Sequence, residues 1–309
     1  MWIKTYNRLD NIENGNKRRI RRLYIQKNKK RANAYTYNNG NIVKRKDLSI
    51  MSIVQFPMLK LSIKLNNVAF SIFNVEIYWY AILIVTAMFL GVVYFQKRDG
   101  MYNIKFADVV DLLLVLIPIS IISARLYYVI FDIEHFIKSP GQILNFRTGG
   151  LAIYGGIIGG FITCIIFCKK RKIQILDLLD FIVPALLLGQ AIGRWGNFIN
   201  VEAYGTETKL PWRMGIYEFG IYKEVHPTFL YESIATFTLF IILAKIAPKR
   251  KFTGQITYLY LICYGLIRML IEGLRTDSLM LGPIRISQLV SAICLGLGII
   301  LYKKSNRPK

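Results

Sequence analysis

Hydrophobic and polar positions alternate along this chain in long blocks. After residue 76, apolar stretches separated by short charged or turn-rich loops are each long enough to cross a bilayer, which takes about 20 helical residues. The pattern predicts an all-α polytopic membrane protein. We expect about seven transmembrane helices, over residues 77–95, 106–131, 149–168, 175–198, 229–247, 254–271 and 287–302.

Short basic loops predict the orientation of these helices. Lys97, Arg98 and Lys105 follow the first span, the segment 169–172 follows the third and the segment 249–251 follows the fifth. Such loops face the cytoplasm under the positive-inside rule. Seven crossings then give a cytoplasmic C-terminus, with a basic tail over 305–309, and an N-terminus outside the cell.

Composition changes the picture mainly at the N-terminus. Of 309 residues 54% are hydrophobic, and the formal net charge of +23 includes fourteen Lys/Arg against three acidic residues within 1–50. Residues 1–57 lack apolar periodicity and read as a disordered or untranslated extension, with Met51 and Met58 as alternative starts. Residues 58–76 form an extracytoplasmic segment and residues 77–304 the membrane domain.

Little in the sequence indicates a cofactor. The four cysteines, Cys164, Cys168, Cys263 and Cys294, all lie inside apolar spans, where a thiol packs as a small hydrophobe. No nucleotide-binding or metal-binding motif occurs. We therefore predict no metal, no cofactor and no nucleic-acid partner.

Polar residues gather toward the side of the membrane opposite the basic loops. In the sixth span Tyr264, Arg268, Glu272 and Arg275 follow one another at spacings of four, four and three, so they share one helical face. Arginine offers a planar fork of donors suited to phosphate. The alternative is a structural Arg/Glu ladder between helices.

The motif GRWGNFINVEAYG, residues 193–205, closes the fourth span. Arg194 and Asn197 are one turn apart and project together, beside glycines that permit close approach of backbone or ligand. This combination favours an anionic, hydroxyl-bearing headgroup. Packing alone could explain the glycines, but it leaves Arg194 unexplained.

Two further positions are candidates. His226 precedes Pro227 at a helix start, where it is either a structural group or part of the site. In the third span, Gly155, Gly159 and neighbouring glycines follow a small-xxx-small spacing that indicates close helix packing, and Tyr154 lies beside that contact.

These segments together resemble a known family. GRWGNFINVEAYG, HPTFLYES (226–233), YGLIRMLIEGLR (264–275) and GGLAIYGG (149–156) resemble the prolipoprotein diacylglyceryl transferases of bacteria, over residues 72–302. The resemblance implies transfer of the diacylglyceryl group of phosphatidylglycerol to the lipobox cysteine of a prolipoprotein, with release of glycerol phosphate. It also implies a multi-pass protein of the bacterial cytoplasmic membrane whose active site faces outward.

The resemblance also implies roles for single residues. Arg194 matches a phosphatidylglycerol-binding arginine, and the other matching positions are Asn197, Glu202, Gly205, Tyr80, Tyr264 and Arg268. Tyr154 stands where some members have a histidine that could act as a base. A tyrosine with a pKa near 10 is a poor base at neutral pH.

We therefore expect Arg194 and Arg268 to hold the phosphate, and Asn197 and Tyr80 to position the glycerol. Glu202 is expected to orient an arginine, and Glu202 and His226 are both candidates for removing the thiol proton. A transporter or a binding protein for an anionic lipid or solute is the alternative. This alternative is disfavoured because the charged residues gather at one end of the predicted spans and no internal repeat is evident.

Overall fold

The structure, a computed structural model, describes residues 35–38, 41–44, 52–73, 75–145, 149–218 and 221–306. The chain divides into two compact units. The strand unit comprises Met1–Tyr80 and Phe198–Pro227, and the helical unit comprises Ala81–Asn197 and Thr228–Lys309. Most of the N-terminal extension, which is expected to be disordered or untranslated, lies outside the described residues, as residues 1–34 do. Residues 307–309 of the basic C-terminal tail also lie outside them.

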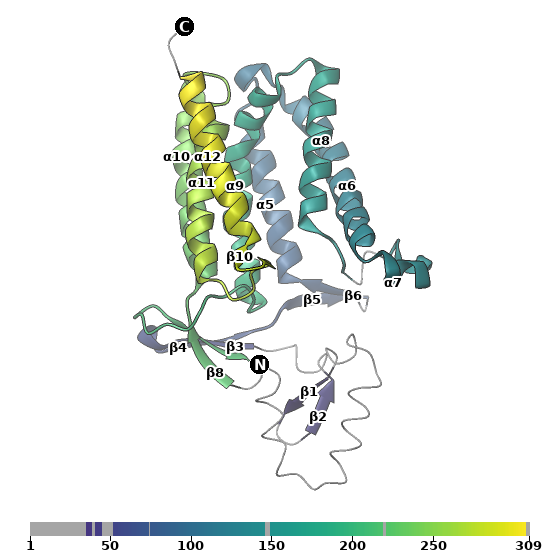
Figure 1. The fold of residues 1–309 in the computed structure, drawn as a ribbon, viewed down its shortest axis with the longest axis vertical. Helices are drawn as coiled ribbons and strands as arrows, with labels where there is room; N and C mark the ends of the chain where they lie inside the picture. Colours follow the sequence, from purple (N-terminus) through teal and green to yellow (C-terminus); the bar gives the residue numbers. More distant parts are fainter. Residues whose placement is uncertain are drawn as a thin grey trace. The chain divides into compact units, whose positions relative to one another are not determined.

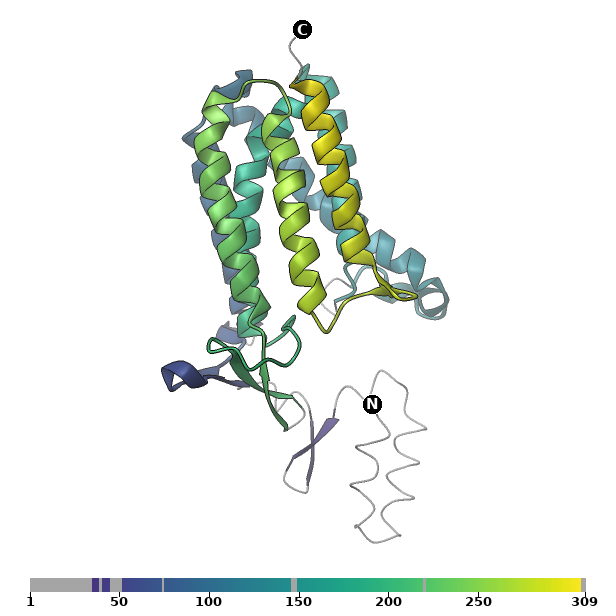
Figure 2. The same cartoon turned by 60° about the vertical axis from the view of Figure 1, so that its left-hand side comes forward.

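The prediction of seven membrane-crossing helices is confirmed. In the described part of the chain, seven helices are long and apolar enough to span a membrane. Figures 1 and 2 show them running alternately in opposite directions. They are α5 (Trp79–Gln96), α6 (Phe106–Phe131), α8 (Ile153–Arg171), α9 (Ile175–Ile199), α10 (Thr228–Ile246), α11 (Gln255–Leu274) and α12 (Ile286–Ser305).

The third span begins four residues later than the sequence predicts. Gly149 and Gly150 have φ of +83° and +80°, outside the helical region, so the helix can begin only beyond them. The remaining elements of the helical unit are short. They are η3 (Met101–Asn103), α7 (Ile133–Lys138), η4 (Pro140–Gln142), η6 (Ala247–Lys249), β9 (Met280–Leu281) and β10 (Ile284–Arg285).

The strand unit contains elements that the sequence analysis did not predict. Its four-stranded antiparallel sheet has the order β4-β3-β7-β8, and Val54 and Ile216, fully buried, face each other across β3 and β7. Ser52–Phe56 form β3 although they lie within the segment expected to be disordered. The strands are β1 (Tyr35–Asn38), β2 (Asn41–Lys44), β3, β4 (Leu61–Leu65), β5 (Val68–Ile72), β6 (Val75–Tyr78), β7 (Met214–Glu218) and β8 (Ile221–Val225), with η2 (Pro57–Leu59) between β3 and β4.

Two groups of buried side chains hold the helical unit together. One joins α5, α6, α8 and α9 and includes Cys164 and Cys168, as the sequence predicts for packed thiols. The other joins α9, α10 and α11 through Leu187, Leu243 and Ile256. Many other large apolar side chains on the seven helices are exposed, as lipid-facing positions are in a membrane protein.

Glycines set the close packing of α6 against α8. A Cβ at Gly155 would lie 2.5 Å from the carbonyl oxygen of Ser123 and 2.4 Å from the Cβ of Tyr127, so backbone blocks it. A Cβ at Gly156 would meet its nearest atom at 3.5 Å, an ordinary contact. The predicted packing role is therefore confirmed for Gly155, whereas Gly156 makes only an ordinary contact.

Replacing Gly155 with alanine is expected to destabilise the α6–α8 pair. Overpacking a tight contact costs about 1–3 kcal/mol. The purified variant should unfold at a lower temperature than the wild type in the same detergent. Gly156→Ala is the matched control and should have the unfolding temperature of the wild type. Equal unfolding temperatures for the two variants would contradict this view of the contact.

A buried carboxylate in α9 caps the start of α11. The side chain of Asp180, which is completely buried, accepts hydrogen bonds from the main-chain N–H of Gly254 and of Thr257, both at 2.8 Å, and from the Thr257 hydroxyl at 2.6 Å. Arg250 adds an ion pair at 2.9 Å. Free N–H groups at a helix start are satisfied in this way, so this charge within a span serves structure.

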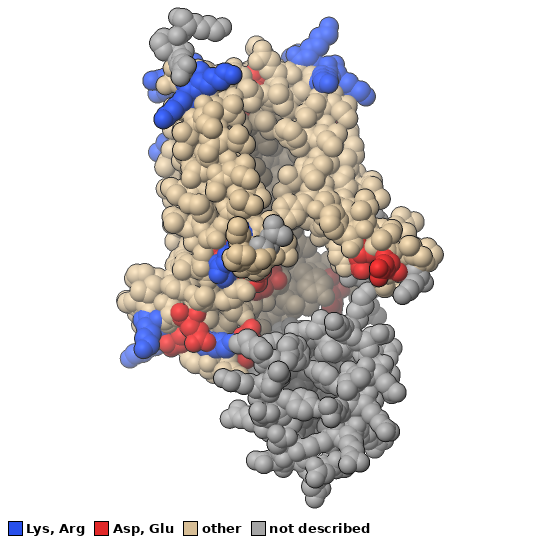
Figure 3. Space-filling model, viewed as in Figure 1, with Lys and Arg blue, Asp and Glu red and all other residues tan. Residues whose placement is uncertain are grey.

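Basic side chains gather at one end of the helical unit. The loops α5–α6, α8–α9 and α10–α11 and the C-terminal turn of α12 meet there, and Figure 3 shows Lys and Arg clustered around that end. We call it the basic end. The opposite end, where α9 and α11 finish and α10 and α12 begin, carries the candidate active site.

Candidate active site

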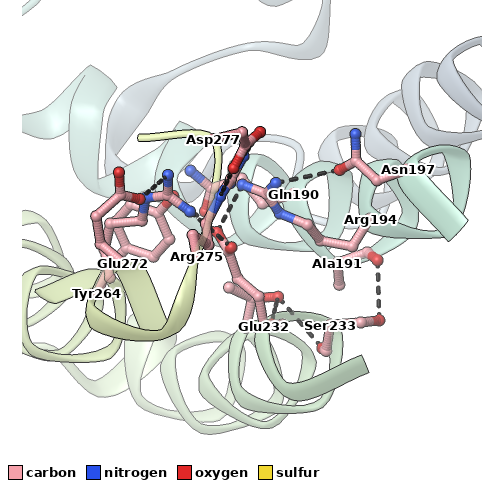
Figure 4. A network of polar contacts seen from close by, with 12 residues as sticks. Gln190, Ala191, Arg194, Asn197, Glu232, Ser233, Tyr264, Glu272, Arg275 and Asp277 are labelled. Atoms are coloured by element: carbon pink, nitrogen blue, oxygen red, sulfur yellow. Dashed lines mark hydrogen bonds and ion pairs between the residues drawn. The ribbon is translucent and has the colours of Figure 1, made fainter. Parts of the chain in front are cut away.

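Three helices converge on one buried carboxylate at the end opposite the basic end. Glu232 on α10 accepts from Arg194 Nη2 on α9 at 2.7 Å and from Arg268 Nη1 on α11 at 2.9 Å. The Tyr264 hydroxyl also donates to Glu232 Oε1, at 3.3 Å. Figure 4 shows Arg194 and Tyr264 on either side of Glu232, with dashed lines marking the polar contacts of the cluster.

Helical spacing explains how α9 and α11 present these groups. Tyr264, Arg268 and Glu272 are each four residues apart on α11, and Arg268 Nη2 lies 2.5 Å from Glu272 Oε2. On α9, Arg194 Nη1 donates to Asn197 Oδ1 at 3.1 Å, one turn further along. The predicted faces of the fourth and sixth spans are therefore brought together on Glu232.

The cluster is buried, yet each charge has an opposite charge beside it. The side chains of Glu232 and Glu272 are each 2% exposed, whereas Arg194 is 21% and Arg268 15% exposed. Isolated charges are costly at such depth, and pairing offsets that cost. The Arg/Glu ladder considered as the alternative from sequence is thus present in the structure.

The two arginines retain unused donors. Each guanidinium has five N–H donors. Arg194 directs Nη1 to Asn197 and Nη2 to Glu232, and Arg268 directs Nη1 to Glu232 and Nη2 to Glu272. Among the described residues the Nε–H of neither arginine has a hydrogen-bond partner, so both can donate to a further acceptor.

An outer layer covers the cluster. Arg275 donates from Nε and Nη2 to the carboxylate of Asp277, at 2.9 and 2.8 Å, and Arg285 donates to the main-chain carbonyl of Glu272. Burial alone would raise the pKa of Asp277, but its bonds to Arg275 hold that pKa below the usual range. The cluster and this outer layer together contain four arginines and three carboxylates, which leaves one surplus positive charge.

A ladder of polar groups continues from the cluster along α9 and α11. Gln190, four residues before Arg194, donates to the Tyr260 hydroxyl at 3.0 Å. The Tyr260 ring stacks on that of Tyr264, with centroids 5.2 Å apart. Tyr264, a predicted binding residue, is therefore fixed from both sides.

The remaining predicted residues of the 193–226 region lie in the strand unit. The Gly205 N–H donates to the His226 carbonyl and the His226 N–H to the Thr206 carbonyl, both at 3.0 Å, so Gly205 and His226 are neighbours. The His226 side chain is partly buried, and this burial lowers its pKa below the ordinary value of 6.5. His226 is therefore neutral at pH 7.

Glu202 is held in an unusual turn. Val201 and Ala203, its two neighbours, have φ of +51° and +56°, a left-handed conformation that non-glycine residues seldom adopt. Such strain costs roughly 1–3 kcal/mol per residue and often marks functional positions. The Glu202 carboxylate accepts from the Asn200 side-chain amide at 3.2 Å.

Tyr80 and Tyr154 each lie near the start of a helix. Tyr80 is the second residue of α5 and is 36% exposed. Tyr154 lies in the first turn of α8. Among the described residues, no hydrogen bond or ion pair joins Tyr154 to the arginine cluster.

Arg125, near the end of α6, binds the carbonyls of a loop. Its side chain is buried, and it donates to the carbonyls of Gln142, Ile143, Gly149 and Gly150 at 2.6–2.9 Å. Gly150 suits this position because its φ is +80°, a conformation that other residues rarely adopt, and a Cβ there would also lie 2.5 Å from Arg125 Nη1. The guanidinium therefore orders the loop before α8.

Sequence analysis assigned no role to Glu232, which is the centre of the cluster. It lies in the quoted segment HPTFLYES, and a lone carboxylate near the start of an apolar span was the available signal. Nothing in spacing could show that this carboxylate faces arginines of two other helices. Asp277 was missed for the same reason.

The fold defines a multi-pass membrane protein, and a buried cluster of paired arginines and carboxylates lies at one end of its helical unit. The chain belongs to the prolipoprotein diacylglyceryl transferase family, whose model matches residues 67–303, and it is a transferase. This finding confirms the resemblance seen in the sequence.

Relatives with high identity carry one name. The phosphatidylglycerol–prolipoprotein diacylglyceryl transferase of Finegoldia magna is 51% identical over 244 residues, which cover 78% of this chain and 97% of the relative. The protein of the same name from Clostridium novyi is 48% identical over 250 residues, covering 78% and 96%. That from Clostridioides difficile is 45% identical over 238 residues, covering 77% and 94%.

Proposed function

We propose that this chain transfers the diacylglyceryl group of phosphatidylglycerol to the lipobox cysteine of a prolipoprotein, the first step of lipoprotein maturation. The sulfur of the cysteine forms a thioether bond to the glyceryl carbon as that carbon's bond to the phosphate oxygen breaks. Glycerol phosphate leaves, and the thiol proton passes to a base. Family membership and the names of the relatives support this reaction.

The observation that carries the proposal is the pairing of Arg194 and Arg268 on one buried carboxylate. Glu232 accepts from both guanidiniums and so holds them beside one carboxylate, and we propose that their remaining N–H groups donate to one phosphate. The surplus positive charge of the cluster and its outer layer together matches the single negative charge of a phosphodiester. As the ester oxygen departs, negative charge grows on the phosphate, and preorganised donors stabilise that change.

Other residues complete the proposed site. Asn197, bonded to Arg194, and Tyr80 are assigned to the glycerol headgroup, and Tyr264 keeps the shared carboxylate in place. Gly205 holds the main chain beside His226. Tyr154 is assigned a place near the reacting groups, and it is not the base because a phenol holds its proton at neutral pH.

The thiol proton needs an acceptor. A cysteine with a pKa of about 8.5 is only a few per cent thiolate at neutral pH. Glu202 and His226 are the two candidates, and the lowered pKa of His226 leaves it in the neutral, accepting form. Glu202 is the alternative, with its position fixed by the strained turn.

This assignment predicts a pH dependence. If neutral His226 accepts the proton, kcat/KM stays constant near pH 7 and falls only as the pH drops through its lowered pKa, below 6.5. His226→Gln should have a lower rate and no such acid limb between pH 5 and about 7. An unchanged acid limb in His226→Gln would assign the base role to Glu202.

We also propose the orientation in the membrane. The basic end faces the cytoplasm under the positive-inside rule, so the arginine cluster opens toward the extracytoplasmic side. Prolipoprotein signal peptides with a lipobox cysteine and phosphatidylglycerol would both reach it from the bacterial cytoplasmic membrane.

A direct assay tests the function. The purified protein is incubated with phosphatidylglycerol and a lipobox peptide, and the peptide mass is read for a diacylglyceryl adduct. A peptide with serine in place of the cysteine is the control and should remain unmodified. Failure of the cysteine peptide to gain the adduct, with folded protein and both substrates present, would refute the proposal.

A further inference from the structure

The hairpin of β5 and β6 has two chemically different faces. Its register pairs Phe70 with Ile77 and Ile72 with Val75, so these four apolar side chains share one face. Ser71 pairs with Glu76 on the other face, where the Tyr78 hydroxyl donates to Glu76 at 2.7 Å. The hairpin is thus amphipathic.

In the described part of the chain no further strand pairs with this hairpin, and its apolar face is exposed. β5 and β6 form a two-stranded sheet, and Phe70 is 50%, Ile72 51% and Val75 42% exposed. A two-stranded hairpin is marginally stable in water, because it buries too little apolar surface. A partner that covers this face would supply what the hairpin lacks.

Phe73, directly after β5, strengthens this point. Its side chain is 98% exposed and its φ is +47°, in the left-handed region. A bulky residue in that conformation is an outlier, and one held fully in water gains nothing from its aromatic surface. Burial of Phe73 in an apolar phase offsets both costs.

The position in the chain identifies that apolar phase. β6 ends at Tyr78 and the membrane-crossing helix α5 begins at Trp79, with no residue between them. Figure 1 shows β6 leading into α5. Tyr78, Trp79 and Tyr80 form an aromatic group of the kind that marks a membrane–water interface.

We propose that the β5–β6 hairpin lies on the bilayer surface, with Phe70, Ile72, Phe73 and Val75 inserted among the lipid acyl chains and Ser71 and Glu76 facing water. The bilayer is the favoured occupant because the hairpin is joined directly to a span, which keeps it at the interface. This surface anchor holds the strand before α5, and with it Tyr80, at the level of the headgroups. It does not depend on the transferase reaction.

Tryptophan quenching tests this placement. Ile72→Trp and Ser71→Trp put the probe on opposite faces at adjacent positions of β5, and the native Trp2, Trp79, Trp195 and Trp212 contribute the same background to both. Each variant is reconstituted in phosphatidylglycerol and phosphatidylcholine vesicles with brominated acyl chains. The added tryptophan of Ile72→Trp should be quenched severalfold more than that of Ser71→Trp, which acrylamide in the water should quench instead.

Two results would overturn the proposal. Equal quenching of both tryptophans by acrylamide would leave the apolar face in water. A tryptophan at position 72 shielded from acrylamide and from bromolipid alike would show that protein covers this face, either a second copy or a bound peptide. If the variants do not fold, amide hydrogen exchange at residues 70–77 of the wild type decides the question. Insertion predicts slower exchange in vesicles than in a short-chain detergent, where the hairpin is exposed to water.

Discussion

Arg268→Gln is expected to lower kcat/KM for diacylglyceryl transfer by about 10²–10³, the usual effect of removing one preorganised donor to developing negative charge. Arg268 lies 2.9 Å from Glu232 and retains an unused Nε–H, so its loss removes a phosphate donor and half of the pairing of Glu232. Arg194→Gln should behave in the same way. Initial rates of adduct formation on a lipobox peptide measure both.

Arg171→Gln is the matched control for these variants. Arg171 pairs with Asp108 and Asp111 at the basic end, so its loss removes an arginine ion pair from the same unit without touching the cluster. It should transfer lipid at the wild-type rate. Wild-type activity of Arg268→Gln would contradict the assignment, and so would an equal loss in Arg171→Gln.

Glu232→Leu is the second variant with a large expected effect. It leaves Arg194 and Arg268 facing each other without the carboxylate that joins them, and breaking a buried pair typically costs about 3–5 kcal/mol. We expect a marked fall in the unfolding temperature in detergent and loss of transfer. The structural role is thus visible in stability as well as in rate.

Glu232→Gln separates positioning from folding. The amide keeps the size of the carboxylate and can accept from one arginine, but the charge-assisted bonds weaken, each by about 1 kcal/mol. We expect a near-native unfolding temperature with kcat reduced about tenfold, since a loss of 1.4 kcal/mol in transition-state stabilisation is tenfold in rate. Unchanged kcat in a folded Glu232→Gln would show that Glu232 does not orient the arginines for the reaction.

The sequence predicted the helices well because bilayer spans depend on local composition. All seven were placed within a few residues, and the error at the third span came from the two glycines with positive φ. The faces of α9 and α11 were also predictable, because residues four apart on a helix always share a face. Arg194, Asn197, Tyr264, Arg268 and Glu272 were identified in this way.

Contacts between helices could not be predicted from such periodicity. Spacing along α10 does not reveal that Glu232 receives arginines from α9 and α11, or that Asp180 of α9 caps α11. Nor does the position of Arg125 near the end of a span reveal that its donors bind loop carbonyls.

The strands of the strand unit were missed for a different reason. β3 pairs with β7, about 160 residues away in the chain, and only that pairing buries Val54 against Ile216. Such a sheet is stabilised by partners that a local pattern does not show. The residues before β3 are expected to be disordered because their composition is basic and rich in asparagine, and most of them lie outside the described residues.

The central claim is that Arg194 and Arg268, joined by Glu232, bind one phosphate. A double-mutant cycle on phosphatidylglycerol affinity tests it most directly, with Arg194→Gln, Arg268→Gln and the double variant titrated in mixed micelles. If both guanidiniums bind one headgroup, the second substitution should add little to the loss of affinity caused by the first. After one substitution, the remaining arginine is neutralised by Glu232. Losses of affinity that simply add would place the two arginines in independent sites and contradict the account.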